Sequence, residues 1–292
     1  MKKWENNVRK VIPYTPGEQP DQPDMIKLNT NENPYPPAPG VARALQEAET
    51  DSLRLYPDPA AGDLVGAIAQ AYGLKNEQVF VGVGSDDVLA MSFLTFFNSE
   101  KPILFPDITY SFYDVWADLF RIPYRRPALD ENFHICTEDY FRENGGIIFP
   151  NPNAPTGVEL PPAEVEEIVK HNPDTVVIVD EAYVDFGGKT ALSLIEKYDN
   201  LLVVQTFSKS RSMAGMRIGF ACGNEKLIIE SLKWMTDTED SATVSIPSKS
   251  LSVSYLTLTD YDAAFWKICT IGLIPGFFLV VGLVVWMKRR KA

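Results

Sequence analysis

The chain has 292 residues, which is enough for one large domain or two ordinary ones. Hydrophobic residues make up 45% and charged residues 23%, a globular balance that excludes wholesale disorder. The net charge of −12 argues against a nucleic-acid-binding protein, which needs a basic face. The two histidines and three cysteines lack ligand spacing, which argues against a metal site and a disulfide framework.

Short apolar runs alternate with helical patterns between residues 41 and 235, after an arm (1–40) rich in Pro, Asn and Gly. The apolar runs predict strands at 78–84, 102–106, 145–150, 175–183 and 201–208. Helical spacing of apolar residues predicts helices at 41–49, 63–73, 86–98, 111–120 and 162–172. This alternation predicts an α/β domain with a mostly parallel sheet and helices on both faces.

The composition changes at about residue 236. Residues 236–262 contain eleven Ser and Thr among twenty-seven residues, so we place a boundary there and treat 236–267 as a separate segment. Residues 268–287 are twenty residues without a charge, and as a helix they would cross about 30 Å of bilayer hydrocarbon. A basic tail, 288–292, follows them. We therefore expect a C-terminal transmembrane helix, with a buried core helix as the alternative.

The N-terminus has no apolar stretch of signal-peptide length. We therefore expect the α/β body to stay in the cytoplasm and to be attached to a membrane through residues 268–287. The basic tail at 288–292 also favours the cytoplasmic side, and a single span cannot satisfy both preferences.

Polar residues follow several predicted strands at their carboxyl ends, which is where open α/β sheets bind ligands. Ser85 and Asp86 follow Gly84 at the start of the helix predicted at 86–98. Free backbone N–H groups at such a helix start are suited to binding a phosphate. Ser and Asp are also common helix caps, so the motif alone leaves both interpretations open.

Asp180, Lys209 and Arg217 follow later strands. A buried acid such as Asp180 needs a cation or hydrogen-bond donors, although a helix cap or a structural ion pair is the alternative. Lys209 follows an apolar strand, and the alternative for it is a solvated loop lysine. A lysine, an acid and an anion-binding helix start are together what pyridoxal phosphate requires.

Seven motifs resemble those of histidinol-phosphate aminotransferases, which are fold-type I aminotransferases. They occur in family order over roughly residues 8–235 and read LNTNENPYPP, RLYPDPAAGDL, VGSDD, PDITYSFY, FPNPNAPTG, VDEAYVDF and QTFSKSRSMAGMRIGF. The resemblance implies a large domain at 41–235 that binds pyridoxal 5′-phosphate, with 1–40 as an arm and part of a small domain. It also implies a homodimer through the large domain, and an amino donor and a 2-oxo acid acceptor as substrates.

The resemblance implies roles for the residues that follow the strands. Lys209 would carry the cofactor, Asp180 would pair with the pyridine nitrogen, and Tyr183 would bind the phenolic oxygen. Tyr110 would stack on the ring, and Asn153 is a further candidate for cofactor binding. The phosphate would be held by Ser85, Asp86, Ser208 and Arg217. The expected substrate contacts are Asn31 and Asn33 in the arm, and Tyr56, which such dimers lend to the neighbouring subunit.

The sequence departs from the family pattern in two places. Ala154 stands before Pro-Thr-Gly, where the family commonly has asparagine, so that role cannot be transferred. No arginine occurs between Arg217 and Arg289, although the family has a substrate-binding arginine in the C-terminal half of its small domain. The small domain is therefore expected to be incomplete. The tail instead resembles the end of a gliding-motility-type ABC transport membrane subunit, as a chimeric reading frame would explain.

The resemblance implies transamination between histidinol phosphate and 2-oxoglutarate in histidine biosynthesis, and we expect the incomplete small domain to impair it. A related decarboxylase of an amino acid phosphate is one alternative. A non-catalytic membrane-tethered protein with a remnant cofactor domain is another.

Overall fold

The computed structural model describes residues 7–12, 28–229, 282, 286–287 and 290. The chain divides into two compact units, 1–239 and 240–292, and nearly all described residues belong to the first. The predicted boundary at 236, the Ser/Thr-rich segment 236–267 and most of 268–287 fall outside the described residues. No helix in the described part of the chain is long and apolar enough to span a membrane.

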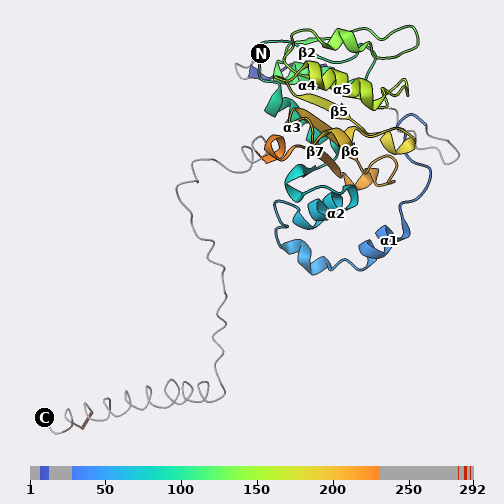
Figure 1. Cartoon of the computed structure of the whole chain (residues 1–292). Coiled ribbons are helices and arrows are strands. Elements are labelled where there is room, and N and C mark those ends of the chain that lie inside the picture. The colour runs from blue at the N-terminus through green and yellow to red at the C-terminus, as the bar shows by residue number, and fades with distance from the viewer. Residues whose placement is uncertain (1–6, 13–27, 230–281, 283–285, 288–289, 291–292) are drawn as a thin grey trace. The chain divides into compact units, whose positions relative to one another are not determined.

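The first unit is built on one mixed sheet (Figure 1). Its strands, among the described residues, are β1 (Val79–Gly82), β2 (Ile103–Leu104), β3 (Tyr124–Arg125), β4 (Ile147–Pro150), β5 (Val177–Asp180), β6 (Leu201–Thr206) and β7 (Gly219–Gly223). Their order across the sheet is β1-β7-β6-β5-β4-β2-β3. The α-helices of the unit are α1 (Pro39–Gln46), α2 (Gly62–Tyr72), α3 (Ser85–Phe96), α4 (Phe112–Phe120) and α5 (Pro162–His171).

Two apolar layers cover the two faces of the sheet. On one face, α2 and α5 pack against alternate strand residues such as Val177, Val179 and Val203. On the other face, α3 and α4 pack against the residues between them, such as Ile178 and Val204. This alternation follows from the two-residue repeat of a strand, and it directs neighbouring residues after β5 to opposite faces.

The expected α/β architecture is confirmed, and each predicted strand and helix is present with ends shifted by a few residues. Two strands were missed. β3 has only two residues, too short for a periodicity. β7 (GFACG) is antiparallel to both β1 and β6, and its glycines and small residues carry no strand signal.

Candidate active site

The carboxyl ends of β5 and β6 bring Lys209, Tyr183 and the N-terminal arm together. Lys209 is half-buried three residues after β6, and its Nζ donates to the carbonyl oxygen of Thr30 at 3.1 Å. The same Nζ lies 5.5 Å from the centre of the Tyr183 ring. The predicted lysine therefore faces an aromatic side chain from the turn that follows the neighbouring strand β5.

The arm closes over this lysine through two asparagines. Asn31 Nδ2 donates to the Tyr183 hydroxyl at 3.0 Å. Asn33 Nδ2 donates to the carbonyl oxygens of Lys209 at 3.1 Å and Ser210 at 3.2 Å. Both residues expected at the substrate side thus contact the residues expected to hold the cofactor.

Asp180 is a buried carboxyl without a cation. It is 4% exposed, and its oxygens accept from the Tyr113 hydroxyl at 2.9 Å and from the Ala182 N–H at 3.2 Å. Burial raises the pKa of Asp180 to about 6, and the two hydrogen bonds oppose that shift. In the described part of the chain, no Lys, Arg or His lies within ion-pair distance of it.

The turn before α3 is held by an ion pair. Arg217 Nη2 lies 3.3 Å from Asp86 Oδ2, and the Tyr110 hydroxyl donates to Asp86 Oδ1 at 2.8 Å. A Cβ on Gly84 would lie 2.4 Å from Arg217 Nη2, and the φ of Gly84 is +87°. Glycine is therefore required where the guanidinium crosses the backbone at the start of α3.

The remaining predicted residues differ in their surroundings. Asn153 is buried, with its Nδ2 donating to the Ile108 carbonyl at 3.0 Å and its Oδ1 accepting from Thr109. Ser208 Oγ accepts from Thr206 Oγ1 at 3.0 Å, beside the Lys209 loop. Ser85 is the first residue of α3. Tyr56 is fully exposed, and its role in a neighbouring subunit stays a prediction.

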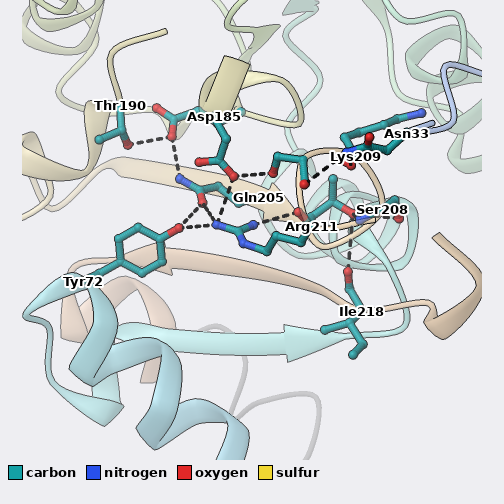
Figure 2. Close-up of polar contacts among 12 residues, drawn as sticks. Asn33, Tyr72, Asp185, Thr190, Gln205, Ser208, Lys209, Arg211 and Ile218 are labelled. Carbon is teal, nitrogen blue, oxygen red and sulfur yellow. Dashed lines mark hydrogen bonds and ion pairs between the residues drawn. The ribbon is translucent and has the colours of Figure 1, made fainter. Parts of the chain in front are cut away.

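Sequence reasoning missed the groups that support these residues. Tyr113 holds Asp180, and it is fully buried in α4. Gln205 and Arg211 belong to a polar cluster beside the Lys209 loop (Figure 2). Arg211 stands in the quoted motif QTFSKSRSMAGMRIGF, but no sequence pattern shows which side chains it meets.

The sequence matches known proteins over most of its length. The family model described as aminotransferase class I and II matches residues 23–262, past the boundary predicted at 236. A histidinol-phosphate aminotransferase of Pseudomonas aeruginosa is 55% identical over 264 residues, which are 90% of this chain and 74% of the relative. One from Lactococcus lactis subsp. cremoris is 54% identical over 77% of this chain, which spans 63% of that relative's length.

Solved structures support the fold. The histidinol-phosphate aminotransferase of Sinorhizobium meliloti in complex with pyridoxal-5′-phosphate superposes with a TM-score of 0.64 at 22% identity, over 70% of this chain and 57% of that one. The L-threonine-O-3-phosphate decarboxylase of Porphyromonas gingivalis gives 0.59 at 22% identity, over 67% and 59%. With the family match over residues 23–262, the chain belongs to the class I and II aminotransferases.

Proposed function

We propose that this chain is a pyridoxal-phosphate-dependent aminotransferase that moves an amino group from histidinol phosphate to 2-oxoglutarate, as in histidine biosynthesis. One observation carries the proposal: a lysine and a buried acid follow neighbouring strands at the same end of the sheet. The half-buried Lys209 follows β6, with its Nζ 5.5 Å from the centre of the Tyr183 ring, and the buried Asp180 ends β5. The names of the relatives at 54–55% identity support the reaction and the substrate.

The residues present fit the cofactor at its ring. Asp180 is buried with two hydrogen-bond donors and no basic partner among the described residues, so a protonated pyridine nitrogen would supply the missing cation. Pyridoxal phosphate, when bound, supplies an electron sink for the substrate's α-carbon. An ionised Asp180 keeps the proton on the ring nitrogen and thereby maintains that sink.

The residues also fit the phosphate. The backbone N–H groups at the start of α3, with Ser85 and Ser208, are suited to an anion. Arg217 supplies the positive charge beside them. The Asp86 carboxylate would repel a phosphate, so we assign that side chain the role of orienting Arg217 and Tyr110.

Lys209 Nζ has two roles in this proposal. It is the amine that attaches the cofactor, and once released it moves the proton at the substrate's α-carbon. Its present acceptor, the Thr30 carbonyl, belongs to the arm, so the arm orients the amine. Tyr183 accepts from Asn31 and keeps its own hydroxyl proton for the phenolic oxygen. Both N–H groups of the Asn153 amide donate within the protein, to the Ile108 carbonyl and to Thr156 Oγ1, so Asn153 has no proton left for that oxygen in this arrangement.

We propose two further properties that the sequence supports. The chain is expected to form a homodimer in which the exposed Tyr56 reaches the other subunit's substrate.

Residues 268–287 are expected to attach the chain to a membrane, because they hold no charge over twenty positions. Extraction of membranes with carbonate tests the attachment, since a peripheral protein would be released.

The test is amino transfer by the purified full chain with pyridoxal phosphate, histidinol phosphate and 2-oxoglutarate. We expect glutamate to form, and we expect Lys209→Ala to abolish it. Release of carbon dioxide from threonine phosphate, without formation of glutamate, would instead favour a decarboxylase. The fold of this chain is similar to that of the Porphyromonas gingivalis decarboxylase. Absence of both products, with the cofactor bound, would favour the non-catalytic alternative.

A further inference from the structure

A row of polar side chains connects the buried Glu181 with the loop that carries Lys209. Figure 2 shows three members of this row, Tyr72, Gln205 and Arg211, beside the loop. Glu181 is 1% exposed, and the function proposed above gives it no role. Its Oε1 accepts from the Ala191 N–H at 2.6 Å. Its Oε2 accepts from Thr190 Oγ1 at 2.6 Å and from Gln205 Nε2 at 2.8 Å. Burial raises the pKa of Glu181 to about 7, and these three donors oppose that shift.

The donors along this row all point toward Glu181. Because Gln205 Nε2 donates to Glu181, Gln205 Oε1 faces the other way and accepts from the Tyr72 hydroxyl at 2.7 Å. The Tyr72 oxygen in turn accepts from Arg211 Nη2 at 2.5 Å. One orientation of each group satisfies all these bonds. Arg211 Nη2 also donates to Gln205 Oε1 at 3.4 Å, so Gln205 connects the Arg211 guanidinium with the Glu181 carboxyl both directly and through Tyr72.

Arg211 is held on its other sides as well. Its Nη1 donates to the Thr206 carbonyl at 2.8 Å, and its Nη2 lies 3.3 Å from Asp185 Oδ2. The guanidinium also lies 4.9 Å from the centre of the Phe207 ring, within cation–π distance. A planar fork with several donors can satisfy this set of partners, and an ammonium group cannot.

The residues next to Lys209 are fixed by the same cluster. Ser210 Oγ donates to Asp185 Oδ2 at 2.5 Å, which is the oxygen that pairs with Arg211. Asn33 holds the carbonyl oxygens of Lys209 and Ser210 from the arm side. The backbone of the loop is thus fastened one and two residues after Lys209, and from two directions.

We propose that Arg211, held by Tyr72, Gln205 and Glu181, is a positioning residue that fixes the Lys209 backbone for attachment of the cofactor. This inference depends on the proposed function, because it assumes that Lys209 is the attachment residue. Asp180 and Glu181 are neighbours at the end of β5 that face opposite sides of the sheet. One therefore serves the ring of the cofactor, and the other the loop of the lysine.

The experiment compares two cofactor forms on the full chain. Pyridoxamine 5′-phosphate has no aldehyde, so its affinity reports the ring and phosphate contacts alone. The aldehyde of pyridoxal phosphate would condense with the Lys209 amine, forming a C=N bond and releasing the aldehyde oxygen as water. The rate of this attachment is followed by visible absorption and by borohydride reduction. Hydrogen exchange of the peptide containing residues 207–213, in protein without cofactor, reports the loop directly.

We expect Arg211→Met to slow attachment about 10-fold or more, with pyridoxamine phosphate affinity within about threefold of wild type. Exchange at 207–213 should become faster. Tyr72→Phe should slow attachment less, and adding it to Arg211→Met should have little further effect, because both changes break one row of hydrogen bonds. Arg211→Lys keeps the charge but loses the planar fork of donors, so it should also slow attachment. It is the variant to use if Arg211→Met does not fold.

The matched control is Arg126→Met. Arg126 forms an ion pair with Asp114 at 3.0 Å and is not part of the cluster beside the loop, so this change should leave all three readouts unchanged. Attachment at the wild-type rate in a folded Arg211 variant would overturn the inference. Equal losses of attachment and of pyridoxamine phosphate affinity would also overturn it, because they would show a general structural role. A wild-type chain that binds neither cofactor form would instead refute the proposed function.

Discussion

Asp180 and Glu181 are adjacent carboxyls, and the role of only the first could be predicted from the sequence. The sequence predicted Asp180 and Lys209 because each follows an apolar strand, and the structure brings both strand ends together. It did not predict Tyr113 or Gln205 as supporting residues. Their contacts arise when α4 and β6 pack beside β5, and no spacing in the sequence records them.

The pKa of Asp180, raised to about 6 from 3.8, predicts a pH dependence of stability in the cofactor-free protein. The fold favours the protonated carboxyl, so this group stabilises the protein below its unfolded pKa, and the contribution is lost as pH rises through about 6. Asp180→Asn should remove that loss and raise the free energy of unfolding at pH 8 by up to about 3 kcal/mol.

Urea denaturation of both proteins between pH 5 and pH 8 measures this effect. The raised pKa of Glu181 remains in the variant and leaves a shallower slope of the same sign. Equal slopes in the two proteins would show that Asp180 is already ionised at little cost.

The contact between β7 and the turn before α3 illustrates what elements add. The sequence predicted α3, and the resemblance assigned a phosphate to its start, but β7 was not predicted because its glycines carry no strand pattern. A Cβ on Gly219 would lie 2.2 Å from Gly84 C and from Ser85 N. Because these are backbone atoms, they cannot move aside as a flexible side chain would, and β7 therefore fixes where the helix begins.

Gly219→Ala should consequently separate β7 from the start of α3 and cost at least about 2 kcal/mol of stability, as overpacking does in well-packed cores. It should also weaken binding of pyridoxamine phosphate through the displaced phosphate site. Gly215→Ala is the control, because a Cβ there has nothing within 4 Å. Thermal unfolding and a binding titration measure both effects, and equal behaviour of the two variants would refute the role of this contact.

Across the whole molecule, the residues proposed for the cofactor and those expected for the substrate differ in what supports them. The described residues bring Lys209, Asp180 and Arg217 onto one edge of the sheet. The sequence holds no arginine from 218 to 288 for a substrate carboxylate or phosphate.

A bidentate guanidinium binds such anions far better than a lysine does. We therefore expect turnover of histidinol phosphate to be at least about 100-fold slower than in the Pseudomonas aeruginosa relative, with cofactor affinity similar. Steady-state kinetics of the two proteins side by side, with matched cofactor titrations, measure this difference. Matching turnover would show that another group of this chain binds the substrate anion.

The most direct test of the account is the site of covalent attachment of pyridoxal phosphate. The full chain is incubated with the cofactor, reduced with borohydride, digested and analysed by mass spectrometry. We expect one modified peptide, carrying the adduct on Lys209, and we expect Lys209→Ala to lose it. An adduct on another lysine, or a stable adduct that persists in Lys209→Ala, would contradict it.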